Sequence, residues 1–104
     1  MAIIASKRRS SRVHIHLPLL LLWKDDQGEH REPTFTLTVS WFGCAVHSRN
    51  FFRPKSRVRL QREAHTMEAQ VVYSLKDHAT DIVEVGLKFD RDGREFWGIW
   101  IWGE

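Results

Sequence analysis

The chain contains 104 residues, with 16 Lys and Arg against 13 Asp and Glu, one Cys and 42% hydrophobic residues. This length fits one small domain and excludes two domains that each bury a core of their own. A single Cys excludes an internal disulfide and the paired thiolates of a structural zinc finger. No apolar run approaches the roughly 18 residues of a membrane-spanning helix. The first twelve residues also lack the pattern of a secretory signal, so we expect a cytoplasmic protein.

Basic residues gather in two stretches of the chain. The first spans residues 7–12, and no acidic residue occurs among residues 1–16. The second spans residues 49–62 and combines six cations with no acidic residue: Arg49, Arg53, Lys55, Arg57, Arg59 and Arg62. We interpret this pattern as a surface that attracts anions, although solvated strand faces also produce it.

The first two predicted strands show apolar residues at every second position. Residues 13–23 carry them at odd positions, so we expect a half-buried strand with its odd face toward the core, followed by a turn at 24–28. Residues 35–41 repeat the alternation and predict a second strand, with Phe35, Leu37, Val39 and Trp41 facing inward. Gly43 indicates a bulge or bend there, and residues 44–48 continue the strand beyond it.

A loop at residues 50–56 precedes three further strands of the same period. Their predicted inward residues are Val58 and Leu60, then Val71, Tyr73 and Leu75, then Val83, Val85, Leu87 and Phe89. Residues 96–102 are apolar on both faces and predict a sixth strand that is covered on both sides or contacts a partner. Since no stretch of ten residues has helical periodicity, we predict a small antiparallel barrel or sandwich of six strands.

The residues that carry chemistry in enzymes do not form a recognisable pattern. His14 and His16 share one strand face, but no third metal ligand follows from the spacing. Cys44 is a candidate nucleophile beside His47, yet its place on a packed strand favours a buried, inert thiol. We therefore predict a protein without catalytic residues, metal or cofactor.

Two short motifs flank the first strand pair. Residues 8–12 (RRSSR) place Arg-x-x-x-Arg before the first strand, and residues 40–43 (SWFG) place Ser-x-x-Gly at the end of the second. In this order, with strands spaced as here over about residues 7–102, the motifs make the sequence resemble the PilZ domain family. The family pairs Arg-x-x-x-Arg with Asp/Asn-x-Ser-x-x-Gly, so Thr38 departs from the pattern at its first position. Further similar segments are Leu17-Pro18, Pro54 to Leu60, Val85-Gly86-Leu87-Lys88-Phe89 and Phe96-Trp97-Gly98.

The resemblance implies a non-enzymatic bacterial receiver for the second messenger cyclic di-GMP. It implies a six-stranded antiparallel barrel over residues 13–104 and a flexible basic tail over residues 1–12, which orders over the ligand and thereby changes partner interactions. Arginine suits this ligand because its guanidinium holds phosphate, reads the guanine edge and stacks on a base. Thr36, Thr38 and Ser40 are expected on one outward strand face. The residues implied to bind the ligand are Arg8, Arg9, Arg12, Thr38, Ser40 and Gly43.

Two other functions stay open at this point. Thr38 offers one short hydroxyl in place of a carboxylate or amide, so a weaker nucleotide contact is expected. A chain that lost the ligand would act as a protein–protein adaptor, with residues 96–102 as a docking or homodimer surface. Single-stranded nucleic acid is the weakest alternative, with Phe51, Phe52 and Trp97 as the available aromatic platforms.

Overall fold

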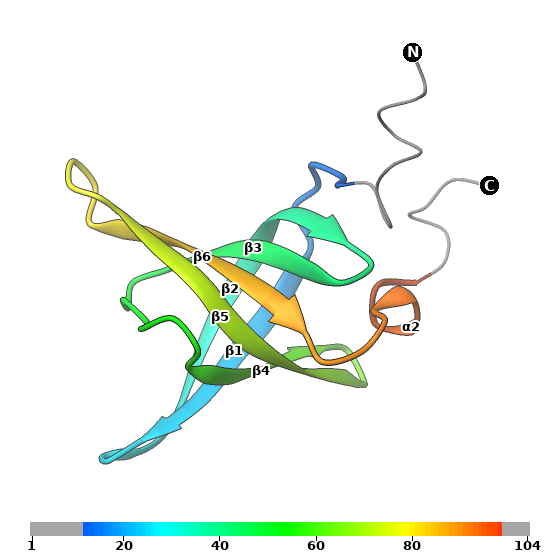
Figure 1. The fold of residues 1–104 in the computed structure, drawn as a ribbon, viewed down its shortest axis with the longest axis horizontal. Coiled ribbons are helices and arrows are strands. Elements are labelled where there is room, and N and C mark those ends of the chain that lie inside the picture. Colours follow the sequence, from blue (N-terminus) through cyan, green and yellow to red (C-terminus); the bar gives the residue numbers. More distant parts are fainter. Residues whose placement is uncertain (1–11, 99–104) are drawn as a thin grey trace.

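The computed structural model describes residues 12–98 as six strands and one short helix (Figure 1). The strands form a closed barrel in the order β1-β2-β3-β6-β5-β4, and every neighbouring pair is antiparallel. No helix in the described range is long and apolar enough to span a membrane. The elements are β1 (Pro18–Asp25), β2 (Gly28–Ser40), β3 (Gly43–Ser48), β4 (Arg57–Arg62), β5 (His65–Asp77), β6 (Ile82–Phe89) and α2 (Arg94–Trp97).

The barrel interior is filled by the apolar residues that alternate along the strands. The prediction of a six-stranded antiparallel barrel is confirmed, and so are the inward faces predicted for β1, β4 and β6. Because side chains alternate across a strand, these three regular strands each bury one residue in two. Their buried residues are Leu19 and Leu21, Val58 and Leu60, and Val83, Val85, Leu87 and Phe89.

The segment before β1 does not continue the strand as predicted. The strand begins at Pro18, and residues 13–17 lie along β2, connected to it by the backbone bridge between Val13 and Val39 and by a hydrogen bond from the Thr36 N–H to the Leu17 carbonyl oxygen (3.0 Å). Buried Thr36 holds the segment, because its hydroxyl accepts from the Leu17 N–H (2.9 Å) and donates to the Ile15 carbonyl oxygen (2.5 Å). A side chain therefore satisfies backbone groups that a regular ladder would have paired.

The predicted inward face of β2 is wrong at its start because the strand carries a bulge. The register with β3 shifts between Thr36 and Thr38, so Leu37 is an extra residue. An extra residue reverses the face of everything beyond it. Thr36 is consequently buried instead of outward, whereas Phe35 is 45% exposed. Gly43 is not a bulge, because it begins β3 in regular pairing with Lys88. The prediction that residues 44–48 continue the second strand is also wrong, since the chain reverses after Ser40 and β3 runs antiparallel to β2.

A second bulge, between Val71 and Tyr73, has the same effect on β5. Val71 is buried as predicted, but Tyr73 pairs with Gly86 on the outer wall and is only half-buried. Leu75, also predicted inward, is 61% exposed.

The predicted sixth strand at residues 96–102 is also wrong, because its described part is helical. Residues 94–97 form the single helical turn α2, and residues 99–102 lie outside the described residues. The Asp92 carboxylate accepts from the Arg94 backbone N–H (2.7 Å) and starts the turn. Phe96 and Trp97 are buried against Phe89, with ring centroids 5.9 and 5.6 Å from its ring. These two side chains lie in the chain's own core, where they are not available as a docking surface.

Candidate functional site

A cavity of about 280 Å³ lies on the outer wall of the barrel, over β2, β3, β6 and β5. The strand register places Thr38, Ala45, Gly86 and Tyr73 in one row across this wall, and Ser40, Gly43 and Lys88 in the next. The residues in the middle of both rows are small, so the wall is hollow between larger side chains at its rims. The cavity is lined by Arg12, Thr38, Val39, Ser40, Phe42, Gly43, Cys44, Ala45, Val72, Tyr73, Gly86, Leu87 and Lys88.

The structure brings together every predicted site residue that it describes. Arg12, Thr38, Ser40 and Gly43 all line this cavity, although they come from three separate segments. Arg8 and Arg9 lie outside the described residues.

Arg12 is positioned by its neighbour in sequence. The Val13 N–H donates to the Val39 carbonyl oxygen (2.8 Å), and the Val39 N–H donates back to Val13 (2.9 Å). Val39 lies between Thr38 and Ser40, so the bridge holds the backbone next to Arg12 against the motif strand. The Arg12 side chain is exposed and reaches the cavity.

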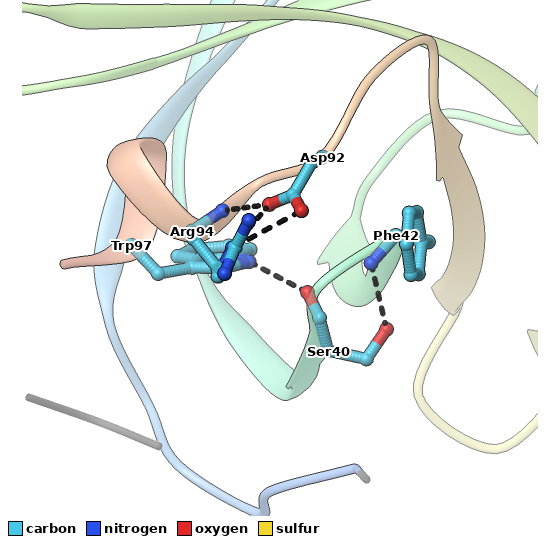
Figure 2. Close-up of polar contacts among 5 residues, drawn as sticks. All are labelled: Ser40, Phe42, Asp92, Arg94 and Trp97. Carbon is cyan, nitrogen blue, oxygen red and sulfur yellow. Dashed lines mark hydrogen bonds and ion pairs between the residues drawn. The ribbon is translucent and has the colours of Figure 1, made fainter. Parts of the chain in front are cut away.

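Thr38 and Ser40 share the outer face of β2 because the bulge at Leu37 precedes both. The prediction that Thr36 joins them is wrong, since its hydroxyl faces inward. The Ser40 hydroxyl donates a long bond to the Gly43 carbonyl oxygen (3.3 Å) and accepts another from the Phe42 N–H (3.4 Å). Figure 2 shows the second of these bonds. Such long bonds are weak, which leaves this hydroxyl able to exchange them for a ligand.

Two glycines allow the close packing of the wall. A Cβ atom on Gly43 would lie 2.2 Å from the Leu87 carbonyl oxygen, and one on Gly86 would lie 2.0 Å from the Tyr73 ring. Glycine within a strand commonly marks such a close approach. Gly86 was therefore the residue in the sequence that indicated a close approach at this position, which the Tyr73 ring makes.

Two functional candidates were missed from the sequence. Lys88 alternates outward on β6 like many solvated lysines, and nothing in its neighbourhood along the chain connects it to Ser40. Tyr73 was assigned to the core because the bulge at Val72 leaves no mark in the hydrophobic period. Both residues line the cavity, on the rim formed by β5 and β6.

The charge of the cavity is positive. Arg12 and Lys88 are its charged lining residues, and no carboxylate lines it among the residues described. Arg57 and Arg59 do not line the cavity. They lie on β4, which pairs with β5 and β1, and their guanidinium groups form ion pairs with Asp90 and Glu68. The cavity is thus suited to an anionic ligand.

The Tyr73 side chain is fixed across this wall. Its hydroxyl donates to the Glu84 carboxylate (2.7 Å) while its ring covers Gly86. Burial raises the pKa of Tyr73 to about 12, and the hydrogen bond to Glu84 and the negative charge of that residue add to the effect. The positive charge of Arg12 acts in the opposite direction and lowers the pKa of Tyr73.

Titration of Tyr73 should therefore report on this site, because it is the only tyrosine of the chain. We expect the near-ultraviolet absorbance of tyrosinate to rise near pH 12 in the folded protein, instead of near the ordinary value of about 10. A raised folded pKa stabilises the fold below about pH 10, and this contribution is lost as the pH rises toward 12. Glu84→Gln, which removes the neighbouring negative charge, should lower the pKa. A tyrosinate titration midpoint near pH 10, in a chain that circular dichroism shows is still folded, would contradict the partial burial of Tyr73 beside Glu84.

The C-terminal turn supports the cavity from behind. Trp97, fully buried, donates its indole N–H to the Ser40 carbonyl oxygen (2.8 Å), as drawn in Figure 2. The Gly93 N–H donates to the Trp41 carbonyl oxygen (2.6 Å), and the Arg94 guanidinium stacks over the Trp41 ring at 4.7 Å. The turn that carries Ser40 and Phe42 into the cavity wall is consequently held by α2 and the residues before it.

The remaining reactive groups in the described part of the chain do not form a second centre. Cys44 is buried, as predicted, and burial raises the pKa of its thiol far above the ordinary range. A protonated, buried thiol is a poor nucleophile. Within residues 12–98, no three His, Cys, Asp or Glu side chains gather in a way that would hold a metal ion.

Several solved structures have a similar fold. The Bacillus subtilis inhibitor of motility, MotI/DgrA, matches 82% of this chain with a TM-score of 0.63 and 21% sequence identity. The K. pneumonia MrkH–c-di-GMP complex matches 80% with a TM-score of 0.60 and 14% identity. A further structure of MrkH, described as a c-di-GMP-dependent transcription regulatory factor, matches 81% with a TM-score of 0.52 and 13% identity.

At these identities the likeness establishes the barrel fold. The matched regions cover 43%, 44% and 43% of the three chains, so this chain spans less than half the length of the proteins it matches. No model of a known protein family matches the sequence, and no curated protein sequence matches it.

Proposed function

We propose that this chain is a PilZ-type receptor domain that binds cyclic di-GMP and acts by binding, without catalysing a reaction. The observation that carries the proposal is that Arg12, Thr38, Ser40 and Gly43 line one cavity, which has two cations and no carboxylate among the lining residues described. Two of the structures with a similar barrel are of MrkH, one of them in complex with c-di-GMP. That complex supports the choice of ligand.

The residues suit the two chemical parts of a cyclic dinucleotide. Arg12 and Lys88 supply positive charge for the phosphates, and the arginine can also hold the O6/N7 edge of a guanine. The Tyr73 ring supplies an aromatic surface for a base. The Ser40 hydroxyl and the open backbone at Gly43 complete the wall.

The arginines of residues 1–12 would respond to the bound ligand. In this proposal Arg8 and Arg9 join Arg12 at the phosphates, so the tail becomes ordered when the ligand is present. Ordering of a segment by a ligand changes the surface that a protein partner meets. The consequence of binding would therefore be an altered interaction with a protein effector.

Isothermal titration with cyclic di-GMP tests the proposal directly. GTP, at the same salt concentration, controls for attraction of phosphate in general. We expect saturable binding of cyclic di-GMP with a clear preference over GTP. Absence of heat from a folded chain would contradict the receptor function and favour the adaptor, for which Thr38 in place of Asp or Asn is the specific argument.

Thr38→Asn should tighten the binding of cyclic di-GMP by about tenfold, because an amide restores the paired donor and acceptor that one hydroxyl lacks. Thr66→Asn is the matched control, since Thr66 is exposed on β5 and does not line the cavity. The measurement is the dissociation constant by the same titration. An affinity that is unchanged or weaker for Thr38→Asn would show that this strand face does not contact the guanine.

A further inference from the structure

The connection between β3 and β4 presents an exposed aromatic ring among cations. We define it as the 49–55 loop. Phe51 is 62% exposed, and Arg49, Arg53 and Lys55 are all exposed around it. The Phe51 ring lies outside the hydrophobic core and in the middle of a basic segment, where it is open to a ligand.

The loop is held firmly from beneath by the residue next to Phe51. Phe52 is buried, and its ring meets the edge of Trp23 at a centroid distance of 5.0 Å. The Phe52 N–H donates to the Ser74 hydroxyl (3.2 Å), and this hydroxyl donates back to the Phe52 carbonyl oxygen (2.8 Å). The Lys55 N–H donates to the Val71 carbonyl oxygen (2.7 Å). The backbone on both sides of Phe51 is therefore anchored, and it holds the Phe51 ring in its exposed position.

The cations of the loop are available for a ligand. Among the residues that the structure describes, Arg57 and Arg59 form ion pairs with carboxylates, but no ion pair involves Arg49, Arg53 or Lys55. One carboxylate lies at the base of the loop. Glu32 accepts from the Ser48 hydroxyl, the Arg49 backbone N–H and the Asn50 amide, at 2.7, 2.9 and 3.2 Å. These three hydrogen bonds offset part of its negative charge.

We propose that the 49–55 loop binds single-stranded nucleic acid, with Phe51 stacking on one base and Arg49, Arg53 and Lys55 contacting the flanking phosphates. Single-stranded nucleic acid supplies both groups that the loop would match, an aromatic face and a series of negative charges. This site is separate from the cavity, because no residue of the loop lines it. It revises the expectation from the sequence alone: Phe52 and Trp97 are buried, and Phe51 is the platform that remains.

The surroundings of the loop argue against a membrane. In Figure 1 the turns of the β1–β2 and β5–β6 hairpins flank the loop and reach past it along the long axis. These turns carry Asp25 and Asp26, and Asp77 and Asp81. A flat bilayer would meet these two hairpin turns before it met the loop, whereas a flexible strand can pass between the hairpins. An acidic protein is also a poorer fit, because interfaces depend on a cluster of buried apolar groups and the loop offers a single ring.

The test measures binding of a fluorescent oligothymidylate by anisotropy over a range of salt concentrations. A length of about 12 nucleotides lies within the site sizes of small domains that bind single strands. Phe51→Ala should weaken binding by about five- to a hundredfold, because stacking of one base is lost. It should leave the salt dependence unchanged. Arg53→Ala should instead reduce the slope of log K against log salt by about 0.7, as expected for one phosphate contact to a single strand.

Matched controls separate these effects from general ones. Phe35→Ala removes an exposed phenylalanine outside the loop, and Arg59→Ala removes an arginine of the same stretch that is paired with Glu68. Both should bind the oligonucleotide like the unchanged chain. Phe51→Ala should also keep its affinity for cyclic di-GMP, so the two proposals fail independently. The inference is overturned if Phe51→Ala binds like the unchanged chain, if polyglutamate competes as well as the oligonucleotide, or if the loop variants alter binding to phosphatidylserine vesicles instead.

Discussion

Replacing Arg12 with alanine is expected to lower the affinity for cyclic di-GMP by about a hundredfold to ten-thousandfold while the unfolding temperature stays unchanged. Arg12 is exposed, so its side chain contributes little to the packing of the barrel. Two charge-assisted hydrogen bonds to one phosphate are worth about 1.5–3 kcal/mol each, and every 1.4 kcal/mol corresponds to about tenfold in affinity. Titration calorimetry measures the first quantity and thermal unfolding the second.

Arg31→Ala is the control for the loss of one positive charge. Arg31 is an exposed arginine on β2, the strand that also carries Thr38 and Ser40, but it does not line the cavity. We expect this variant to bind within about twofold of the unchanged chain, since an exposed charge at a distance is largely screened. Equal affinities for the Arg12 and Arg31 variants would mean that the ligand does not use this cavity.

Gly43→Ala should produce the largest loss of stability from adding a single methyl group. The new Cβ would lie 2.2 Å from the Leu87 carbonyl oxygen and 3.5 Å from the Lys88 Cα, and both atoms belong to the backbone of the neighbouring strand. A flexible side chain could move aside, but here β3 and β6 must separate. We expect a cost of about 3 kcal/mol or more, which lowers the unfolding temperature by roughly 12 °C or more in a domain of this size.

Gly28→Ala tests whether the effect comes from the contact or only from the loss of a glycine. No atom lies within 4 Å of a Cβ placed on Gly28, although its φ of 115° is unfavourable for alanine. Its cost should be limited to local backbone strain of about 1–2 kcal/mol. If the two variants unfold at the same temperature, the close approach at Gly43 is not what destabilises the fold.

The same position connects stability with the proposed function. Gly43 is part of the second motif, and it also sets the distance between β3 and β6 where the two site rows cross the wall. Gly43→Ala should therefore bind cyclic di-GMP poorly even at temperatures below its unfolding transition. A loss of binding with full stability would instead indicate that the glycine is needed for contact with the ligand alone.

The alternation of apolar residues was sufficient to predict an antiparallel barrel or sandwich and most of its core, and the resemblance to the PilZ family favoured the barrel. In β1, β4 and β6 the strand period is regular, so the inward residues follow from the sequence alone. The errors cluster at the bulges in β2 and β5, where one extra residue puts the inward positions before it and those after it out of step. Phe35, Tyr73 and Leu75 were misplaced for this reason. A bulge depends on pairing with another strand, and that pairing is not visible in either strand separately.

The C-terminal residues show a different kind of limit. Residues 96 and 97 have the apolar character of a strand, but Asp92 starts a helical turn, and aromatic packing against Phe89 buries both side chains. Burial between elements distant in sequence outweighed the local preference. Trp97 consequently contacts the Ser40 carbonyl oxygen, a connection across 57 residues that no local pattern indicates.

For the candidate site, the sequence determined which residue types were present and in what order. It contained Arg12 before the barrel, Thr38, Ser40 and Gly43 around a turn, and a basic stretch around Phe51. Only the tertiary structure decided which of these groups meet. The strand register brings Lys88 and Tyr73 to the same outer wall as Ser40 and Thr38, on its other rim. Ion pairs hold Arg57 and Arg59 on a different strand. The physical reason is that the chemistry of a side chain is local, whereas its neighbours, exposure and net charge environment depend on how the barrel closes.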